Sequence, residues 1–338
     1  MTMNETNNMA SIARLRDMKV PDDYPHVAAL FNTIEPDSVT AQSLEEEDRH
    51  VPATSHLTLN EHGLLAGFGR TRVVAENEEG AIIGYGASFR APWTDPGQFG
   101  STFCVHPDYR NQGVGSLLLA HIEKWANEQQ ASILLSTVHD WIDASLPFVE
   151  KRGFQLDAHV FDLLLDLRRT YDPVQQKDAA AQAMRSGIRF ITFAEIRGED
   201  SEQKLYELCV ETAKDNPGQY GSLPPLEQWR NEFLPEDISR DDWIFIALDG
   251  DRFVGVTQLF TTDEEGVLYT NYTGVRKEYR GRGIAKALKQ LSIECALKEG
   301  AHTLTTDAEE SNAPMQAINR GFGFLPGKGH YRILKQLK

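Results

Sequence analysis

The sequence carries one short pattern twice, and this repetition constrains the fold more than any other feature. Residues 105–115 and 275–285 each have the character of a strand end, a tight turn with an arginine and small residues, and the first turn of a helix. Arg110 and Arg280 hold equivalent places 170 residues apart, and the Gly-Phe pairs at 153–154 and 323–324 keep that offset. A constant offset predicts two copies of one domain without an insertion between them.

The turn in each copy is suited to binding an anion. The N-terminus of a helix leaves about four N–H groups without partners and carries roughly half a positive charge. Glycines at this place let a phosphate reach the backbone, and the guanidinium groups of Arg110 and Arg280 add positive charge. The same glycines could instead serve only to let the helix pack closely on the sheet.

The spacing Arg-x-x-Gly-x-Gly/Ala between a strand and a helix resembles the pyrophosphate loop of the GNAT acetyltransferases, which holds coenzyme A. The resemblance covers about 300 residues. It implies an α/β protein with two tandem GNAT-like domains, each a mixed, mostly antiparallel sheet flanked by helices. We therefore expect a flexible N-terminus at 1–12, one domain at 13–169, a linker at 170–187 that is helical in part, and a second domain at 188–338.

The resemblance also implies which residues would hold acetyl-CoA. The loop would bind the pyrophosphate and the preceding strand would pair with the pantetheine arm as an added strand does. In the first copy these residues are Phe103, Cys104, Val105, Arg110, Asn111, Gln112, Gly113, Val114, Gly115 and Ser116. In the second copy they are Thr273, Gly274, Val275, Arg280, Gly281, Arg282, Gly283, Ile284, Ala285 and Lys286.

The two loops differ in charge. The net charge is zero over residues 106–116 and +4 over residues 276–286, with histidine taken as neutral. Because coenzyme A carries several negative phosphate charges, the second loop is electrostatically favoured. Screening of exposed charges by salt would weaken this preference.

The segment from Asn312 to Phe324 resembles the last helix of tandem GNAT proteins of the mycothiol-synthase type. The resemblance implies that the Asn312 side chain bonds the pantetheine arm, although a helix N-cap is an alternative use of this asparagine. The first copy has Ile142 in place of Asn312, and Val149 in place of Asn319.

The catalytic acid and base are not evident. Many GNAT enzymes use a strand glutamate and a tyrosine in the last helix, but neither strand here has that glutamate, and the tyrosine position holds Asn319 or Val149. Tyr272, Asp307 and Asn319 are the catalytic candidates, and packing or surface roles are the alternatives. Cys104 could carry an acyl group, but a lone thiol on a central strand is more typical of a small buried residue.

Composition limits the partners. The 338-residue chain has 34 Lys and Arg against 50 Asp and Glu, a net charge of −16, which argues against nucleic acid. The acidity suits a cationic substrate or serves solubility alone. No apolar run is long enough for a membrane span, and residues 1–10 lack a signal-peptide pattern. Three cysteines without paired spacing and no metal-ligand pattern predict a cytoplasmic protein without a metal.

These observations predict an acetyl-CoA-dependent N-acetyltransferase that acts on the amine of a small, cationic molecule of antibiotic, aminoglycoside or polyamine type. We expect the acceptor to bind near residues 35–47 or 215–220, and the protein to be a monomer or homodimer. One alternative is a non-catalytic coenzyme A-binding regulatory or scaffold protein, which the missing glutamate and tyrosine would favour. A protein N-acetyltransferase is a further alternative.

Overall fold

The computed structural model describes residues 13–35, 39–49, 55–91, 94–169, 178–185, 187–216, 223–235 and 237–337. The expected flexible segment 1–12 and half of the expected linker, residues 170–177 and 186, lie outside them. Within the linker, one helix is described, α7 (Asp178–Arg185). The chain forms two compact units, one with residues 1–138, 142–157 and 332–338, the other with residues 139–141 and 158–331.

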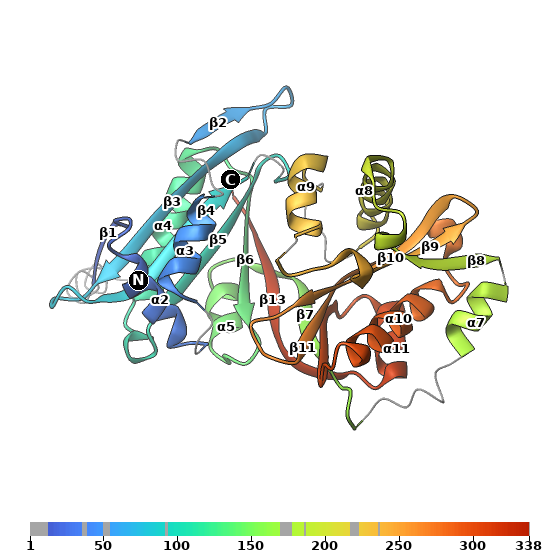
Figure 1. The fold of residues 1–338 in the computed structure, drawn as a ribbon. Helices are drawn as coiled ribbons and strands as arrows, with labels where there is room; N and C mark the ends of the chain where they lie inside the picture. The colour runs from blue at the N-terminus through green and yellow to red at the C-terminus, as the bar shows by residue number, and fades with distance from the viewer. Residues whose placement is uncertain are drawn as a thin grey trace. The chain divides into compact units, whose positions relative to one another are not determined.

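The first unit is a mostly antiparallel sheet with helices on its faces (Figure 1). Its strands lie in the order β1-β3-β4-β5-β6, with β2 paired to β3, and the end of β13 follows β6. The elements are β1 (Arg14–Asp17), α2 (Tyr24–Asn32), α3 (Ala41–Arg49), β2 (His56–Leu59), β3 (Leu65–Glu76), β4 (Ile82–Arg90), β5 (Gln98–Val105), α4 (Val114–Glu128), β6 (Ile133–His139) and α5 (Ser145–Glu150).

The second unit has the same plan, with strand order β7-β12-β11-β10-β9-β8 and the start of β13 beside β7. Its elements are β7 (Gln155–Asp166), β8 (Ile188–Thr192), α8 (Glu199–Ala213), α9 (Leu226–Phe233), β9 (Ile244–Asp249), β10 (Arg252–Thr261), β11 (Val267–Val275), α10 (Ile284–Lys298), β12 (Thr303–Glu309), α11 (Ala313–Phe322) and β13 (Leu325–Gln336). From β4 onward the elements of the first copy recur in the second at or close to the predicted offset of 170, so the sequence repeat is also a structural repeat there.

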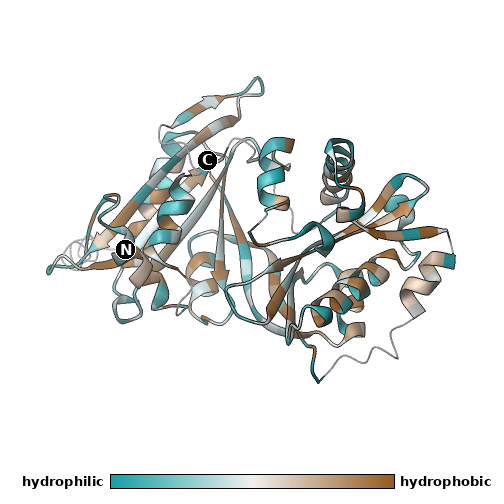
Figure 2. Cartoon of the chain, in the orientation of Figure 1, coloured by the Kyte–Doolittle hydropathy of each residue, from teal (hydrophilic) through white to brown (hydrophobic). Residues whose placement is uncertain are grey.

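The helix after each loop packs on the sheet through an apolar stripe. Leu118 and Ile122 of α4 are fully buried, as are Leu288 and Ile293 of α10. Figure 2 shows hydrophobic residues along α10 and β9, whereas the visible side of α8 is largely hydrophilic. A glycine in the neighbouring strand permits the close approach in each copy; a Cβ at Gly84 would lie 3.0 Å from Leu118.

The compact units and the sequence repeats do not contain the same last strands. β7 comes from the first copy, yet it pairs antiparallel with β12 of the second unit, from Val160↔Glu309 to Asp166↔Thr303. The end of β13 comes from the second copy, yet its residues belong to the first unit, where the Leu337 N–H donates to the Ser132 carbonyl at 2.8 Å. The boundaries 13–169 and 188–338 therefore stay a proposal that describes the sequence repeats. They are not the bounds of the compact units, because the units exchange their last strands.

Candidate active site

The two loops have nearly the same backbone. Asn111 and Gly281 have φ of 59° and 75°, and Gly113 and Gly283 have φ of 89° and 79°, all in the left-handed region. Gly113 and Gly283 are the N-caps of α4 and α10, and no side chain caps either helix. The first N–H groups of both helices thus have no side-chain cap, as an anion site at a helix N-terminus requires.

The loop arginines fasten the turns to the strands before them. The Arg110 Nε donates to the Val105 carbonyl at 3.2 Å, and the Arg280 Nε donates to the Val275 carbonyl at 3.1 Å. Arg280 also forms an ion pair with Asp215 at 3.1 Å. The arginines therefore shape the loops, in addition to the positive charge that they bring.

The first loop is covered by side chains of α5. A Cβ on Gly115 would lie 3.1 Å from the Phe148 ring, and the Phe103 ring lies 6.2 Å from the Phe148 ring. Arg152 stacks on Phe148 and donates to the Ser116 hydroxyl at 2.6 Å. The first turn of α4 is thus occupied by the protein's own side chains.

The second loop is open at its glycines. A Cβ on Gly281 or Gly283 would have no described atom within 4 Å. At the positions equivalent to Phe148 and Arg152 stand Ile318 and Phe322, and Lys286 lies 5.8 Å from the Phe322 ring centroid. Ala285 stands where the first loop has Gly115, and an anion meets a more positive surface here than at the first loop.

In both units the central strands separate toward the loop. The parallel pairing of β5 with β6 ends at Ser101↔Ser136, and that of β11 with β12 ends at Tyr269↔Thr305. The edges of residues 102–105 and 270–275 are then free of these ladders, which leaves backbone groups for an extended ligand. The strand residues of the cofactor prediction lie on these edges.

A β-bulge distinguishes the second copy. Gln258 pairs with Tyr272 and Leu259 pairs with Thr270, so Asn271 is the extra residue on β11. The corresponding ladder of β4 and β5 runs without interruption from Gly84↔Val105 to Phe89↔Gly100. Bulges of this kind re-aim side chains and recur beside active sites.

The three catalytic candidates have separate surroundings. The Tyr272 hydroxyl bonds the Thr212 hydroxyl at 2.8 Å, and burial is the main cause that raises the Tyr272 pKa above its usual value of 10. Asp307 is exposed and accepts a hydrogen bond from the Tyr269 hydroxyl. Asn319 is fully buried, and neither atom of its amide has a partner among the described residues. Of these, Tyr272 keeps its proton at neutral pH and is unsuited to act as a base.

Cys104 and Asn312 show the alternatives that the sequence left open. Cys104 is buried, and burial raises the pKa of its thiol to about 12, which disfavours a nucleophilic thiolate. Asn312 is the N-cap of α11, and its Oδ1 accepts the Met315 N–H at 3.3 Å. Its Nδ2 is left for any cofactor contact.

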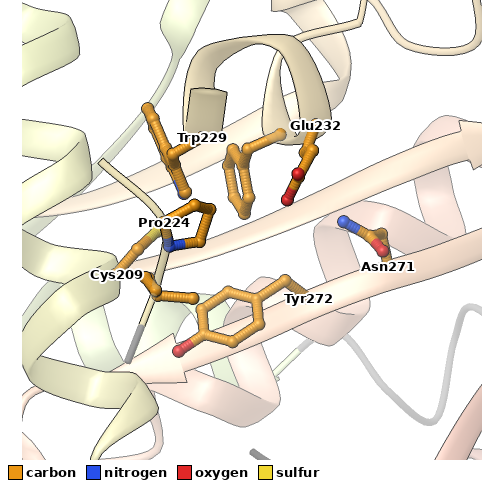
Figure 3. A pocket seen from close by; sticks show the side chains of 8 residues that line it. Cys209, Pro224, Trp229, Glu232, Asn271 and Tyr272 are labelled. Atoms are coloured by element: carbon orange, nitrogen blue, oxygen red, sulfur yellow. The ribbon is translucent and has the colours of Figure 1, made fainter. Parts of the chain in front are cut away.

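A pocket of about 230 Å³ lies beside the bulge, between α8, α9 and β11 (Figure 3). Its lining residues are Cys209, Leu223, Pro224, Trp229, Glu232, Phe233, Asn271 and Tyr272. The Asn271 Nδ2 donates to Gln258 Oε1 at 3.2 Å, which fixes the bulged side chain at the wall. The pocket is mostly apolar, with a few polar groups, as small-molecule sites are.

Sequence reasoning placed the acceptor near 35–47 or 215–220. Residues 36–38 and 217–220 lie outside the described residues, and Asp215 is engaged by Arg280. Sequence reasoning missed Trp229 and Glu232. The available signal was the pair Trp229 and Phe233, one helical turn apart on an otherwise polar segment.

The first unit has an ion cluster between α2, α3 and β3. Asp48 of α3 accepts hydrogen bonds from Tyr24, Arg72 and Arg70, the last at 2.7 Å. Burial works to raise the Asp48 pKa, but the bonds from Tyr24 and Arg72 outweigh it and hold the pKa below its usual value. This carboxylate is thus already neutralised by the protein.

Both units have separating strands and left-handed turns at uncapped helices, and a small pocket adjoins these features in the second unit. Together they define a tandem transferase fold for a phosphate-bearing cofactor. The chain belongs to the acetyltransferase (GNAT) family, whose model matches residues 29–154 and 203–324. This confirms the predicted fold class and the resemblance, and it identifies an N-acetyltransferase that uses acetyl-CoA. Among the helices that the described residues form, none has the length and apolar character for crossing a membrane.

Curated relatives agree with the family. N-alpha-acetyltransferase 30 of Schizosaccharomyces pombe is 30% identical over 138 residues, which are 39% of this chain and 85% of that protein. Mycothiol acetyltransferase of Corynebacterium glutamicum is 26% identical over 238 residues, which are 67% of this chain and 72% of that protein.

Solved structures share the fold over nearly the whole chain. A GCN5-related N-acetyltransferase from Sphaerobacter thermophilus has a TM-score of 0.70 at 18% identity and covers 96% of both chains. A tandem GNAT protein from the clavulanic acid biosynthesis pathway has a TM-score of 0.68 at 18% identity, over 96% of this chain and 99% of that one.

Proposed function

We propose that the second copy binds acetyl-CoA and transfers its acetyl group to the amine of a small, cationic molecule held in the pocket of α8, α9 and β11. The observation that carries this proposal is the combination of an open, positive loop and a bulged strand beside a pocket in one unit. The first copy has a covered loop and an ion cluster instead.

The residues of the second copy fit the cofactor. The left-handed glycines leave space at the loop, α10 presents uncapped N–H groups, and residues 270–275 have a free edge. The loop from Arg280 to Lys286 would hold the pyrophosphate, and Thr273 to Val275 with Asn312 would hold the pantetheine arm. Acetyl-CoA, when bound, supplies an acetyl group already activated as a thioester.

The pocket residues would prepare the amine. An ammonium must lose a proton before its nitrogen can act as a nucleophile. The site therefore has to hold the ammonium where water can take that proton. Glu232 is the carboxylate among the lining residues, is exposed, and can hold the ammonium at the mouth. Tyr272 lines the same pocket and keeps its proton; its hydroxyl, which bonds Thr212, would have to turn from Thr212 to donate that proton to the departing thiolate of coenzyme A. Orientation of the amine would supply much of the rate enhancement.

The first copy would act as a structural domain. Phe148 and Arg152 cover the first turn of α4, and Asp48 is engaged by two arginines. We therefore expect one molecule of acetyl-CoA per chain. The free cysteines Cys104, Cys209 and Cys295 support the further proposal of a cytoplasmic location.

Matched loop variants test the assignment of the copies. Gly283→Val should raise the KM for acetyl-CoA at least tenfold, because a β-branched residue resists the left-handed backbone that opens the helix N-terminus. Gly113→Val makes the same change in the first copy and should leave activity intact. The measurements are native mass spectrometry for bound acetyl-CoA and release of the coenzyme A thiol. The reverse pattern, or two bound molecules, would overturn the assignment.

A protein N-acetyltransferase is a second candidate, favoured by the relative named N-alpha-acetyltransferase 30. Thiol release with short peptides bearing a free N-terminus, compared with small amines, separates the two candidates. Binding of acetyl-CoA without thiol release on addition of any amine would instead support a non-catalytic coenzyme A-binding protein.

A further inference from the structure

The walls of the pocket are aromatic and flat. The rings of Trp229 and Phe233 stack with centroids 4.8 Å apart and an interplanar angle of 17°. The Tyr272 ring meets the Phe233 ring edge-on, with centroids 6.0 Å apart. Cys209, Leu223 and Pro224 complete the apolar lining. Such walls favour a flat, apolar body over a hydrated polar one.

A second feature of the pocket is the indole N–H of Trp229. Trp229 is 2% exposed, and its Nε1 has no hydrogen-bond partner among the described residues. The Nε1 atom has almost no accessible surface in the free protein, so a ligand acceptor would gain from this N–H once a small movement of the ring opens it to the pocket.

The other polar groups of the pocket are largely engaged. The Asn271 Nδ2 donates to Gln258, and the Tyr272 hydroxyl bonds Thr212, which itself donates to the Leu208 carbonyl. One oxygen of Glu232 accepts from Gln228 Nε2 at 2.8 Å, and the other can accept from a ligand. The lining residues therefore offer one carboxylate and no cationic side chain.

Size limits the occupant further. A volume of about 230 Å³ corresponds to about eight water molecules at the density of the liquid. The body of an aminoglycoside or a long polyamine would extend beyond it, and the lining residues offer its additional ammonium groups no second carboxylate.

We propose that the acceptor is a compact monoamine with a flat apolar body, whose ammonium binds Glu232 and whose hydrogen-bond acceptor meets the Trp229 indole N–H. This rests on the proposed function of the second copy and refines its substrate class. The side chains that line the described pocket decide which amine binds there. The net charge of −16 belongs to the whole chain and does not describe this pocket.

Three amines test the class with the full-length protein and acetyl-CoA. They are 4-methoxyphenethylamine, which has an aromatic body and an oxygen acceptor; 2-phenylethylamine, which lacks the oxygen; and spermidine, a polycation. The order of kcat/KM, followed by thiol release, should be the methoxy compound, then phenylethylamine, then spermidine at least about tenfold lower. A preference for spermidine would overturn the substrate class but leave the proposed function standing. Absence of thiol release with every amine, despite bound acetyl-CoA, would count against both.

Two variants test the contacts. Trp229→Phe keeps a flat wall and removes the N–H, so the KM for the methoxy compound should rise about fivefold, as loss of about one hydrogen bond implies, while that for phenylethylamine stays unchanged. Trp243→Phe is the matched control, because Trp243 also has a buried, unpartnered Nε1 but lies outside the pocket. An equal effect of Trp229→Phe on both amines would refute the hydrogen bond.

Glu232→Gln should raise the KM for both aromatic amines at least about tenfold, because it removes the charge that opposes the ammonium. Glu227→Gln, on an exposed part of the same helix, is the control. Thermal melting of all four variants identifies any loss of folding. An unchanged KM in folded Glu232→Gln would overturn the role of this carboxylate.

Discussion

At the scale of single residues, Lys289 shows how strongly position changes chemistry. It lies on α10 with 1% exposure, and its Nζ is 5.4 Å from the centroid of the Phe324 ring. Burial lowers its pKa from 10.5 to about 7, while the carboxylate of Asp307 acts in the opposite direction. Between these two pH values the unfolded chain binds a proton that the folded protein does not. Stability therefore rises with pH over this window, and the full penalty applies below about pH 7.

Lys289→Met should accordingly stabilise the protein, because it fills the same space without a charge. The gain in the free energy of unfolding should be on the order of 2 kcal/mol at pH 6 and smaller at pH 10. Thermal melts at both pH values measure it, with the exposed Lys298→Met on the same helix as the control. An equal gain at both pH values would contradict the shifted pKa.

At the scale of elements, the start of α11 has two candidate duties. Asn312 caps the helix through its Oδ1, whereas the cofactor prediction needs its Nδ2. A serine can cap a helix but cannot replace an amide donor.

Comparison of Asn312→Ser with Asn312→Ala separates these duties. Both variants should raise the KM for acetyl-CoA if the amide bonds the cofactor, and only the alanine variant should also lose about 1 kcal/mol of stability. The measurements are steady-state kinetics and chemical denaturation. A normal KM in the serine variant would leave Asn312 as a cap alone.

The elements also show how far sequence reasoning reaches. The helices at 25–32, 204–214 and 226–233 and the strands that lead into both loops were predictable, because apolar periodicity and turn residues mark them. Segment 37–47, left open between helix and loop, contains much of α3. The short strands β1, β2 and β8 were missed, since their mixed exposure gives no clear alternation. In the site, the loops were predictable from local glycines, whereas the bulge at Asn271 depends on register between strands, which no local pattern encodes.

At the scale of the whole molecule, each unit is closed by a strand from the other copy. Leu163 and Leu165 of β7 are buried in the second unit, and Ile333 of β13 is buried in the first. The Lys335 Nζ pairs with Glu123 at 2.6 Å, and Arg332 pairs with Asp157 at 3.1 Å, both within the first unit. Burial of each such apolar side chain stabilises a unit by about 1.5–3 kcal/mol.

A chain cut by an inserted protease site within residues 170–177 should therefore stay together, because each fragment supplies a strand that the other fragment's unit needs. Size-exclusion chromatography should show the two fragments co-eluting until denaturant is added. The fragments expressed separately should lack cooperative thermal melts. Separation of the fragments in native buffer would show that the exchanged strands are dispensable.

The exchanged strand also bears on the order in which the protein can form during its synthesis. Domains usually fold one after another as they leave the ribosome. Here the first unit lacks its last strand until residues 332–337 have been translated, although its other strands were made some two hundred residues earlier. During that interval β6 has an unpaired edge, a surface that promotes association with other chains. The nascent chain should thus depend on chaperones until residues 332–337 have been made, and slow translation of residues 140–331 should lower the yield.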